Sequence, residues 1–181
     1  MKKWTWMLIA VVLVGLMVGA SVLYNQLSVE YAPQQLVTQP VENLAPDFTM
    51  TDKDGNAVKL SDFFGKPIVL NFWASWCGPC QYEMPELEMA YQELGDDVEF
   101  LMVNLTDGYS ETVSSAKAFL EDNGYTFPVY FDTLSEGTRI YQVYSMPRTF
   151  FLDRNGALVS KHIGMITGEI LWEGINLILA E

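Results

Sequence analysis

The sequence has few of the residue types from which metal sites and hydrolytic centres are built. Its 181 residues include two cysteines, Cys77 and Cys80, and one histidine, His162. Structural zinc usually takes four cysteine or histidine ligands, and a cysteine protease needs a histidine beside its thiol. His162 lies far along the sequence from both cysteines, so we expect neither kind of site, and no metal ion or organic cofactor. We predict that His162 is an ordinary residue of the last strand.

Positive charge is also scarce, with 10 lysines and arginines against 23 aspartates and glutamates. Lys2 and Lys3 are followed by no further basic residue until Lys53, whereas every acidic residue lies after residue 24. The part of the chain that follows residue 24 is therefore strongly acidic. This charge argues against nucleic acid or anionic lipid headgroups as partners.

Charge of either sign is absent from residues 5–24, which are mostly apolar. At about 1.5 Å per residue this run covers the roughly 30 Å hydrocarbon core of a membrane. The lysines before it place the N-terminus in the cytoplasm and the rest of the chain outside. We expect residues 1–24 to be an N-terminal anchor in the cell membrane. A cleaved signal peptide is the alternative, because small residues occupy positions 18–20; either way the C-terminal domain is extracytoplasmic.

The remainder divides into a linker and one domain. Residues 25–42 are polar, rich in glutamine and broken by Pro33 and Pro40, which is typical of a tether. Residues 43–181 have the length of one ordinary domain. The hydrophobic patterns and turn signals predict its elements in chain order. They are a hairpin at 48–60, a buried strand at 66–74, a helix at 77–97, a buried strand at 98–105, a helix at 110–125, a short strand at 127–132, a short helix at 135–144, a hairpin at 148–164 and an amphipathic helix at 167–180.

Strands that alternate with helices and finish on a hairpin predict an α/β fold, with a mixed β-sheet and helices on both faces. We expect Pro85 to kink the helix that follows the cysteines unless the neighbouring geometry adapts. The helix at 110–125 is predicted to open at Ser110 and to close at Asn123–Gly124.

The two cysteines are separated by two residues, and this spacing limits what they can be. A stabilising disulfide would close a very short loop and would remove little entropy from the unfolded chain. Redox exchange fits better, because a thiolate at the first turn of a helix is stabilised by free backbone N–H groups and the helix dipole. Cys77 is then the attacking nucleophile, and Cys80, one turn further, resolves the mixed disulfide. Trp76 and Trp73 would form an apolar rim for a partner chain, although core packing explains Trp73 equally well.

The motifs FWASWCGPC (72–80) and SMPRTFFLD (145–153) resemble the thioredoxin superfamily. The anchor, the run from Ala45 to Cys80, the motif CQYEMPEL (80–87) and an extra strand and helix before the second motif look most like membrane-anchored TlpA/ResA-type thiol-disulfide oxidoreductases. The likeness covers about residues 44–179. It implies a thioredoxin-like fold with a central mixed sheet flanked by helices, an N-terminal β-hairpin and a central strand-helix insertion.

The resemblance also implies roles for particular residues. Pro147 would be the cis-proline that faces the disulfide, and the backbone of Met146 would pair with a substrate strand. The substrate-binding residues expected on this basis are Trp76, Gly78, Pro79, Met146 and Pro147. Threonine is frequent after this proline in ResA-like sequences, and Arg148 departs from it. Arg148 would favour the Cys77 thiolate, recruit acidic partners or point to solvent.

Asn71 departs from thioredoxins, in which the matching position holds a buried acid that helps to move a proton for the resolving cysteine. An amide cannot titrate, so this function is absent or relocated. Glu83 lies three residues after Cys80, and the glutamate at this spacing is an active-site residue in ResA-like proteins. We predict that Glu83 is the proton acceptor or tunes the pKa of the pair, with its own pKa raised by burial. The alternative is a solvated helix glutamate, as we expect for Glu86 and Glu88.

Taken together, the residues and the resemblance predict a membrane-tethered, monomeric thiol-disulfide oxidoreductase. It would reduce disulfides of exported proteins, such as apocytochrome c, through a Cys77 mixed disulfide, and a membrane thiol-electron carrier of the CcdA/DsbD type would supply electrons. A peroxiredoxin-like peroxidase is an alternative, although that class expects a threonine before its reactive cysteine and this chain has Trp76. A redox-responsive binding module without turnover is the non-enzymatic alternative. The direction of electron flow is open, and Gly78–Pro79 favours the reducing direction only by likeness to thioredoxin.

Overall fold

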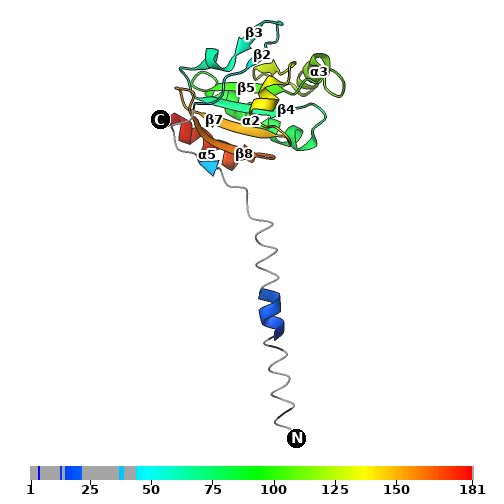
Figure 1. Ribbon diagram of the computed structural model, residues 1–181, viewed down its shortest axis with the longest axis vertical. Helices are drawn as coiled ribbons and strands as arrows, with labels where there is room; N and C mark the ends of the chain where they lie inside the picture. Colours follow the sequence, from blue (N-terminus) through cyan, green and yellow to red (C-terminus); the bar gives the residue numbers. More distant parts are fainter. Residues whose placement is uncertain (1–3, 5–12, 14, 22–36, 39–43, 181) are drawn as a thin grey trace. The chain divides into compact units, whose positions relative to one another are not determined.

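The computed structural model describes Trp4, Leu13, residues 15–21, Val37–Thr38 and residues 44–180 (Figure 1). The chain divides into two compact units, Met1–Gln34 and Gln35–Glu181. Residues 15–21 of the first unit are helical. Within the described parts of the chain, no helix is both long and apolar enough to cross a membrane. Most of the predicted anchor at 1–24 and of the predicted linker at 25–42 lies outside the described residues.

A mixed sheet of eight strands forms the centre of the second unit, in the order β1-β8-β7-β4-β5-β6-β2-β3. The strands β4, β5 and β6 run parallel, and the other neighbouring pairs are antiparallel. The strand bounds are β1 Val37–Thr38, β2 Thr49–Thr51, β3 Ala57–Lys59, β4 Ile68–Trp73, β5 Glu99–Asn104, β6 Val129–Phe131, β7 Arg148–Leu152 and β8 Leu158–Ile163. The predicted hairpins correspond to β2–β3 and β7–β8.

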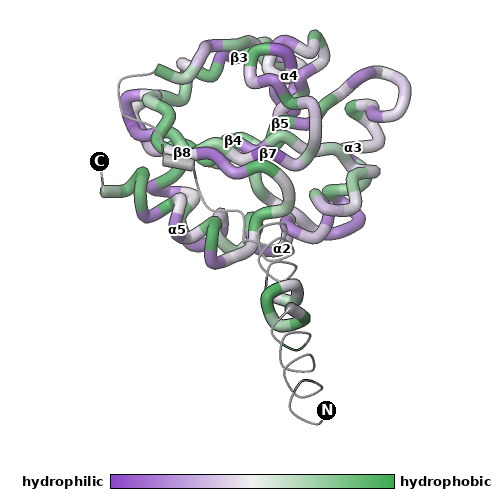
Figure 2. The backbone as a smooth tube through the Cα atoms, turned by 60° about the horizontal axis from the view of Figure 1, so that its bottom comes forward, coloured by the Kyte–Doolittle hydropathy of each residue, from purple (hydrophilic) through white to green (hydrophobic). Residues whose placement is uncertain are grey.

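Helices cover both faces of this sheet, as predicted. The helices α2, α3 and α5 pack on one face, and the 3-10 helix η1 and the short α4 pack on the other. Figure 2 shows α2 and α5 on one side of the strands and α4 on the opposite side. The bounds are η1 Leu60–Phe63, α2 Gly78–Leu94, α3 Val113–Asn123, α4 Glu136–Ile140 and α5 Gly168–Leu179.

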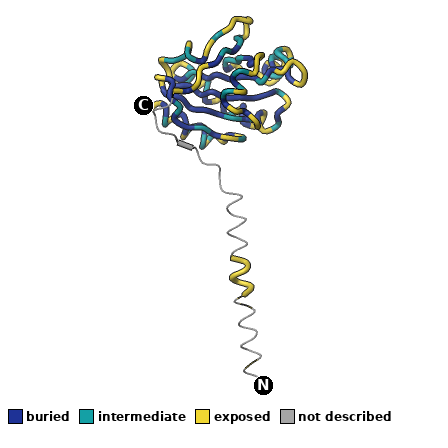
Figure 3. Tube along the Cα trace, viewed as in Figure 1, coloured by how far each residue is buried: buried dark blue, intermediate teal, exposed yellow. Residues whose placement is uncertain are grey.

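The central strand β4 carries the chain to the cysteines and is buried at every position (Figure 3). Its side chains alternate between the two faces, so that Val69 and Trp73 join the core under α2 while Leu70 and Phe72 join the core under α4. Burial on both faces is typical of a central strand with parallel neighbours. Asn71 therefore lies in the middle of an otherwise apolar row beneath α2.

The structure differs from the sequence predictions at the start of α3 and at the strand β1. The helix α3 begins at Val113 with Thr112 as its N-cap, because the side chains of Thr112 and Ser115 bond reciprocally to each other's backbone N–H groups. Ser110, the predicted cap, donates instead to the carboxylate of Asp107. Pro85, which we expected to kink the helix unless the neighbouring geometry adapts, lies inside α2. The strand β1 was not predicted; it falls in the stretch expected to be a linker and pairs with β8.

Candidate active site

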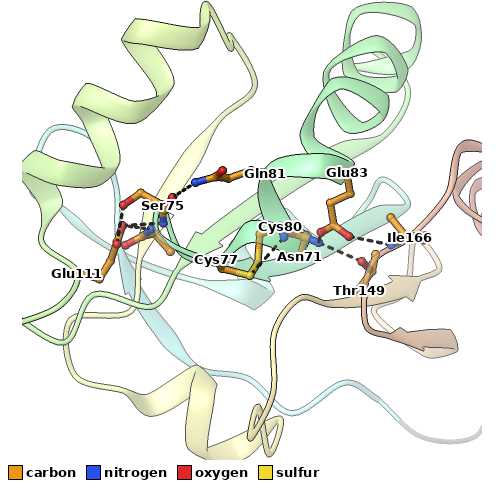
Figure 4. Close-up of a disulfide and its surroundings, with 10 residues drawn as sticks. Asn71, Ser75, Cys77, Cys80, Gln81, Glu83, Glu111, Thr149 and Ile166 are labelled. Carbon is orange, nitrogen blue, oxygen red and sulfur yellow. Dashed lines mark hydrogen bonds between the residues drawn. A yellow bond between two sulfur atoms is a disulfide. The ribbon is translucent and has the colours of Figure 1, made fainter.

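The two cysteines form a disulfide at the N-terminus of α2 (Figure 4). Their sulfur atoms are 2.09 Å apart and their Cα atoms 5.2 Å apart. Cys77 is the N-cap residue of α2, and the backbone N–H of Cys80 donates to its Sγ over 3.3 Å. Cys77 is 5% exposed and Cys80 is fully buried. Cys77 is therefore the sulfur that an incoming thiol or disulfide reaches first.

The residues next to the disulfide divide into surface and core. The side chain of Trp76 is 56% exposed, whereas Trp73 is fully buried and its ring packs against that of Phe119. Trp73 thus belongs to the core, and Trp76 alone of the two can form the predicted apolar rim. Gly78 and Pro79 lie in the first turn of α2, where the missing N–H of proline leaves no hydrogen bond unmade.

The peptide bond between Met146 and Pro147 is cis, as the resemblance implied. The register pairs Arg148, the first residue of β7, with Phe72 of β4. Pro147 therefore lies beside the end of β4 from which the chain runs to the cysteines. Met146 is partly buried and packs against the core cluster that contains both cysteines. The two motifs that carried the resemblance thus meet at the same end of the sheet.

Glu83 is buried beneath α2 and accepts hydrogen bonds from two sides (Figure 4). Its Oε1 accepts from Nδ2 of Asn71 over 2.8 Å, and its Oε2 accepts from the backbone N–H of Ile166 over 2.8 Å. The same Asn71 amide also donates to Oγ1 of Thr149 over 3.0 Å. The amide at position 71 and the acid at position 83 are therefore partners in one buried polar cluster.

Burial controls the ionisation of this carboxyl group. Loss of hydration raises the pKa of Glu83 from 4.5 to about 7, although the hydrogen bonds from Ile166 and Asn71 favour the charged form and lower the pKa. A carboxyl group with this pKa gains and loses a proton near neutral pH. This suits a group that exchanges protons with a cysteine one helical turn away.

A second buried carboxylate, Glu111, supports the loop that leads into the cysteines. It accepts from the backbone N–H of Ser75 over 3.2 Å and from the Ser75 hydroxyl over 2.7 Å (Figure 4). Nδ2 of Asn104, at the end of β5, donates to it over 2.8 Å. Glu111 therefore ties the residue before Trp76 to the neighbouring strand. The sequence contained no signal for this role, since Glu111 lies 36 residues from Ser75.

Substitution of Glu111 with glutamine is expected to loosen the loop at Ser75. The amide keeps the size of the side chain but presents only one acceptor oxygen to three donors, so at least one buried donor loses its partner. We expect the free energy of unfolding to fall by about 2 kcal/mol, as for other unpaired buried groups. Urea unfolding of the variant measures this loss. An unchanged midpoint would show that the contacts of Glu111 do not hold the loop.

An open groove of about 500 Å³ adjoins the buried polar cluster. It is lined by Tyr82, Glu86, Met165, Ile166, Thr167 and Gly168. The side chains of Tyr82 and Met165 are exposed along it, and the backbone of Ile166 in its wall holds the Glu83 carboxylate. A larger pocket of about 560 Å³ lies between the β2–β3 hairpin and the residues before β6. The larger pocket contains no residue of the polar cluster around Glu83, whereas the groove contains Ile166, so the groove is the better candidate for contact with a substrate.

The profile of the AhpC/TSA family matches residues 41–161, well over half of the chain. The chain belongs to the AhpC/TSA family. Within it, the thiol-disulfide oxidoreductase ResA of Geobacillus kaustophilus is 40% identical over 132 residues, which cover 71% of this chain and 72% of that protein. The thioredoxin-like protein YneN of Bacillus subtilis is 32% identical over 177 residues, which cover 98% of this chain and 99% of YneN.

The chain is also similar to solved structures. The pneumococcal exposed lipoprotein thioredoxin Etrx1 of Streptococcus pneumoniae superposes with a TM-score of 0.63 at 31% identity, over 72% of this chain and 98% of that one. Together with the ResA relative and the close pair Cys77–Cys80, these likenesses confirm that this member of the AhpC/TSA family is a thiol-disulfide oxidoreductase with a thioredoxin-like fold.

Arg148 and His162, the two remaining residues considered in the sequence analysis, have different surroundings in this oxidoreductase. Thr149 bonds to Asn71 beneath α2, so Arg148, its neighbour on β7, projects to the opposite face of the sheet from Glu83. Its Nε is buried, and the described residues offer it no hydrogen-bond partner. His162 lies on β8, as predicted, with its side chain buried. Across the described part of the chain, no three His, Cys, Asp or Glu side chains are grouped so that they could hold a metal ion.

Proposed function

We propose that the chain is an extracytoplasmic, membrane-tethered reductase of protein disulfides. The main support for the mechanism is the position of Glu83. It is a buried acid one helical turn after Cys80, and its carboxylate accepts hydrogen bonds from two donors. A buried acid without a catalytic task would cost stability near neutral pH, because its charged form is poorly hydrated. A role as proton acceptor for the cysteine pair would explain why a buried acid is present at position 83.

The reaction begins with the reduced pair. The thiolate of Cys77 attacks one sulfur of a substrate disulfide, and the other substrate sulfur leaves as a thiolate, so that a mixed disulfide forms. Cys80 then loses its proton and attacks Cys77 Sγ. The second substrate sulfur leaves, the substrate holds two thiols, and the protein holds the Cys77–Cys80 disulfide seen in the structure. Two electrons have passed from the cysteine pair to the substrate.

Glu83 acts in the second step. Cys80 is fully buried and must become a thiolate before it can attack. With a pKa of about 7, the Glu83 carboxylate accepts that proton near neutral pH. In this assignment Asn71 holds the carboxylate in place and contributes no proton of its own, because its amide does not titrate.

The substrate segment binds along the end of the sheet that carries the disulfide. The backbone of Met146, before the cis-proline, pairs with an extended substrate strand, and Trp76 covers its side chains. The groove at Tyr82 and Met165 takes an apolar side chain next to the substrate cysteine. Apocytochrome c is a substrate of this kind, since a disulfide in an extended segment is what the site would recognise.

The place of action follows from the N-terminal segment. The uncharged run at 5–24 and the lysines before it favour a tether in the cell membrane with the domain outside. The similar pneumococcal protein is an exposed lipoprotein, which supports an extracytoplasmic site for this chain. A reductase outside the cytoplasm is oxidised at each turnover, so a membrane thiol-electron carrier must return two electrons to Cys77–Cys80.

The reduction potential of the cysteine pair tests this proposal. We expect the full chain in detergent micelles, equilibrated with thiol-disulfide buffers, to have a potential near the value of about −270 mV of thioredoxin. The fraction of oxidised protein is read by alkylation and mass spectrometry. A value near about −120 mV, typical of strong oxidants, would overturn the reductase assignment and leave an oxidase of substrate thiols.

A further inference from the structure

The only histidine of the sequence is joined to Glu83 through a single peptide group. Nε2 of His162 lies 3.1 Å from the carbonyl oxygen of Met165. The N–H of the same peptide group, that of Ile166, donates to Oε2 of Glu83 over 2.8 Å. The register of β7 and β8 also pairs His162 with Thr149, the residue that accepts from Asn71. His162 is thus linked to Glu83 through the Met165–Ile166 peptide group, and it lies on the strand next to Thr149, the partner of Asn71.

The directions of these hydrogen bonds are fixed by their chemistry. A carbonyl oxygen can only accept, so the contact with Met165 requires a proton on Nε2 of His162. In the neutral ring Nδ1 then carries no proton. Donation to the Met165 carbonyl polarises the peptide group and makes the Ile166 N–H a stronger donor, because hydrogen bonds in a chain reinforce one another. In both hydrogen bonds the donor lies on the His162 side and the acceptor on the side of the Glu83 carboxylate.

We propose that His162 is a positioning residue of the redox centre: through the Met165–Ile166 peptide it fixes and strengthens the hydrogen bond that holds the Glu83 carboxylate. The inference rests on the proposed role of Glu83 as proton acceptor, and adds to it a residue that does not touch the reacting atoms. His162 acts on the charged form of Glu83, and so helps to set the pH at which Glu83 exchanges its proton.

The other charged groups around Glu83 do not substitute for His162. On α2 itself the titratable neighbours are Cys80 and Glu86, and on α5 they are Glu169 and Glu173, which are exposed. The basic residues Arg148 of β7 and Lys161 of β8 alternate with Thr149 and His162 and so project to the opposite face of the sheet. Asn71 of β4 is uncharged. His162 is therefore the group on the Glu83 side of the sheet that can supply a proton donor to the peptide.

The test compares two substitutions of His162 in the full chain in detergent micelles. His162→Leu removes the donor, and His162→Gln keeps an N–H₂ group that can reach the Met165 carbonyl. Titration of Glu83 is followed by the ¹³C resonance of its carboxyl carbon, assigned by its absence in Glu83→Gln. We expect the midpoint to rise by about half a pH unit in His162→Leu, since the weakened bond favours the charged form less. In His162→Gln we expect the wild-type midpoint.

Ser160→Ala is the matched control, because Ser160 is a buried polar residue two positions away on the same face of β8 and no described residue bonds its hydroxyl. Equal shifts in Ser160→Ala and His162→Leu would overturn the inference, as would a wild-type midpoint in His162→Leu. If His162→Leu does not fold, the ¹⁵N chemical shifts of the wild-type imidazole show which ring nitrogen carries the proton. A proton on Nδ1 alone would refute the inference. None of these readouts requires turnover, so failure here is distinct from failure of the reductase proposal.

Discussion

Substitution of Cys80 with serine is expected to stop turnover and to leave substrates attached to Cys77. The attack by Cys77 still occurs, but no second thiol is present to release the mixed disulfide. We expect the rate of substrate reduction to fall at least about a thousandfold, because the two cysteines act as a unit. Non-reducing electrophoresis of membranes from cells that express the full-length variant should show covalent adducts that disappear with a reducing agent. Mass spectrometry of the adducts then identifies the substrates.

The controls for this experiment are the Cys77→Ser variant and the double variant, neither of which should form adducts. Adducts in the Cys77→Ser variant would mean that Cys80 is the attacking sulfur, which its full burial argues against. A different outcome would support a binding module without turnover: no adducts in Cys80→Ser, while the affinity for a partner still follows the redox state of the wild-type pair.

Substitution of Glu83 with glutamine is expected to remove the pH dependence of mixed-disulfide resolution near pH 7. Glutamine keeps the shape of the side chain but cannot accept the Cys80 proton. We expect the resolution rate at pH 7 to fall about a hundredfold, within the usual range for loss of a general base. Stopped-flow measurement of resolution between pH 5 and 9 tests this. If the variant retained the wild-type pH profile, Glu83 would not be the proton acceptor.

The same substitution should change how stability depends on pH. Burial raises the pKa of Glu83 from 4.5 to about 7, so the folded protein holds this proton more tightly than the unfolded chain does. The contribution of Glu83 to stability is therefore complete below about pH 4.5 and is lost as the pH rises through 7, by about 3 kcal/mol in total. Urea unfolding at pH 5 and pH 8 should show this decline in the wild type and a smaller one in Glu83→Gln.

Glu93→Gln is the matched control for both measurements. Glu93 lies on the same helix α2 and is exposed, so its charge is already hydrated. We expect its substitution to leave the resolution profile and the stability difference between pH 5 and pH 8 as in the wild type. A similar effect of both substitutions would point to the net charge of α2 rather than to the buried carboxyl group.

The features of the site that depend on local sequence could be predicted. The spacing of Cys77, Cys80 and Glu83 places all three along the first turns of one helix, and the pattern of residues 66–74 identifies the buried strand before it. The fold followed from the alternation of strands and helices and from the resemblance. The resemblance identified Asn71 as a departure from thioredoxins and pointed to Glu83, but the direct hydrogen bond between the two side chains was not predicted.

The features that depend on distant contacts could not be predicted. Glu111 reaches Ser75 because the loop before α3 turns back over the end of β5, and no periodic pattern encodes such a turn. The start of α3 was misplaced because Ser110 and Thr112 are both good cap residues; Thr112 forms the reciprocal hydrogen bonds with Ser115, whereas Ser110 donates to the Asp107 carboxylate. His162 was placed on the correct strand, but its link to Glu83 requires the register of β7 and β8 and the path of the following loop.

The short strands β1 and β3 at the two borders of the sheet affect how the protein meets unfolded chains. An exposed sheet border offers free backbone groups that capture other strands and lead to aggregation. Here β8 is capped by the two-residue β1, and the opposite border is the three-residue β3, which ends at Lys59. Neither border offers a long template for a further strand. If the substrates are unfolded exported chains, as we propose, these short borders leave the backbone beside Pro147 as the place where an extended strand would pair, and they protect the protein from joining aggregates of such chains.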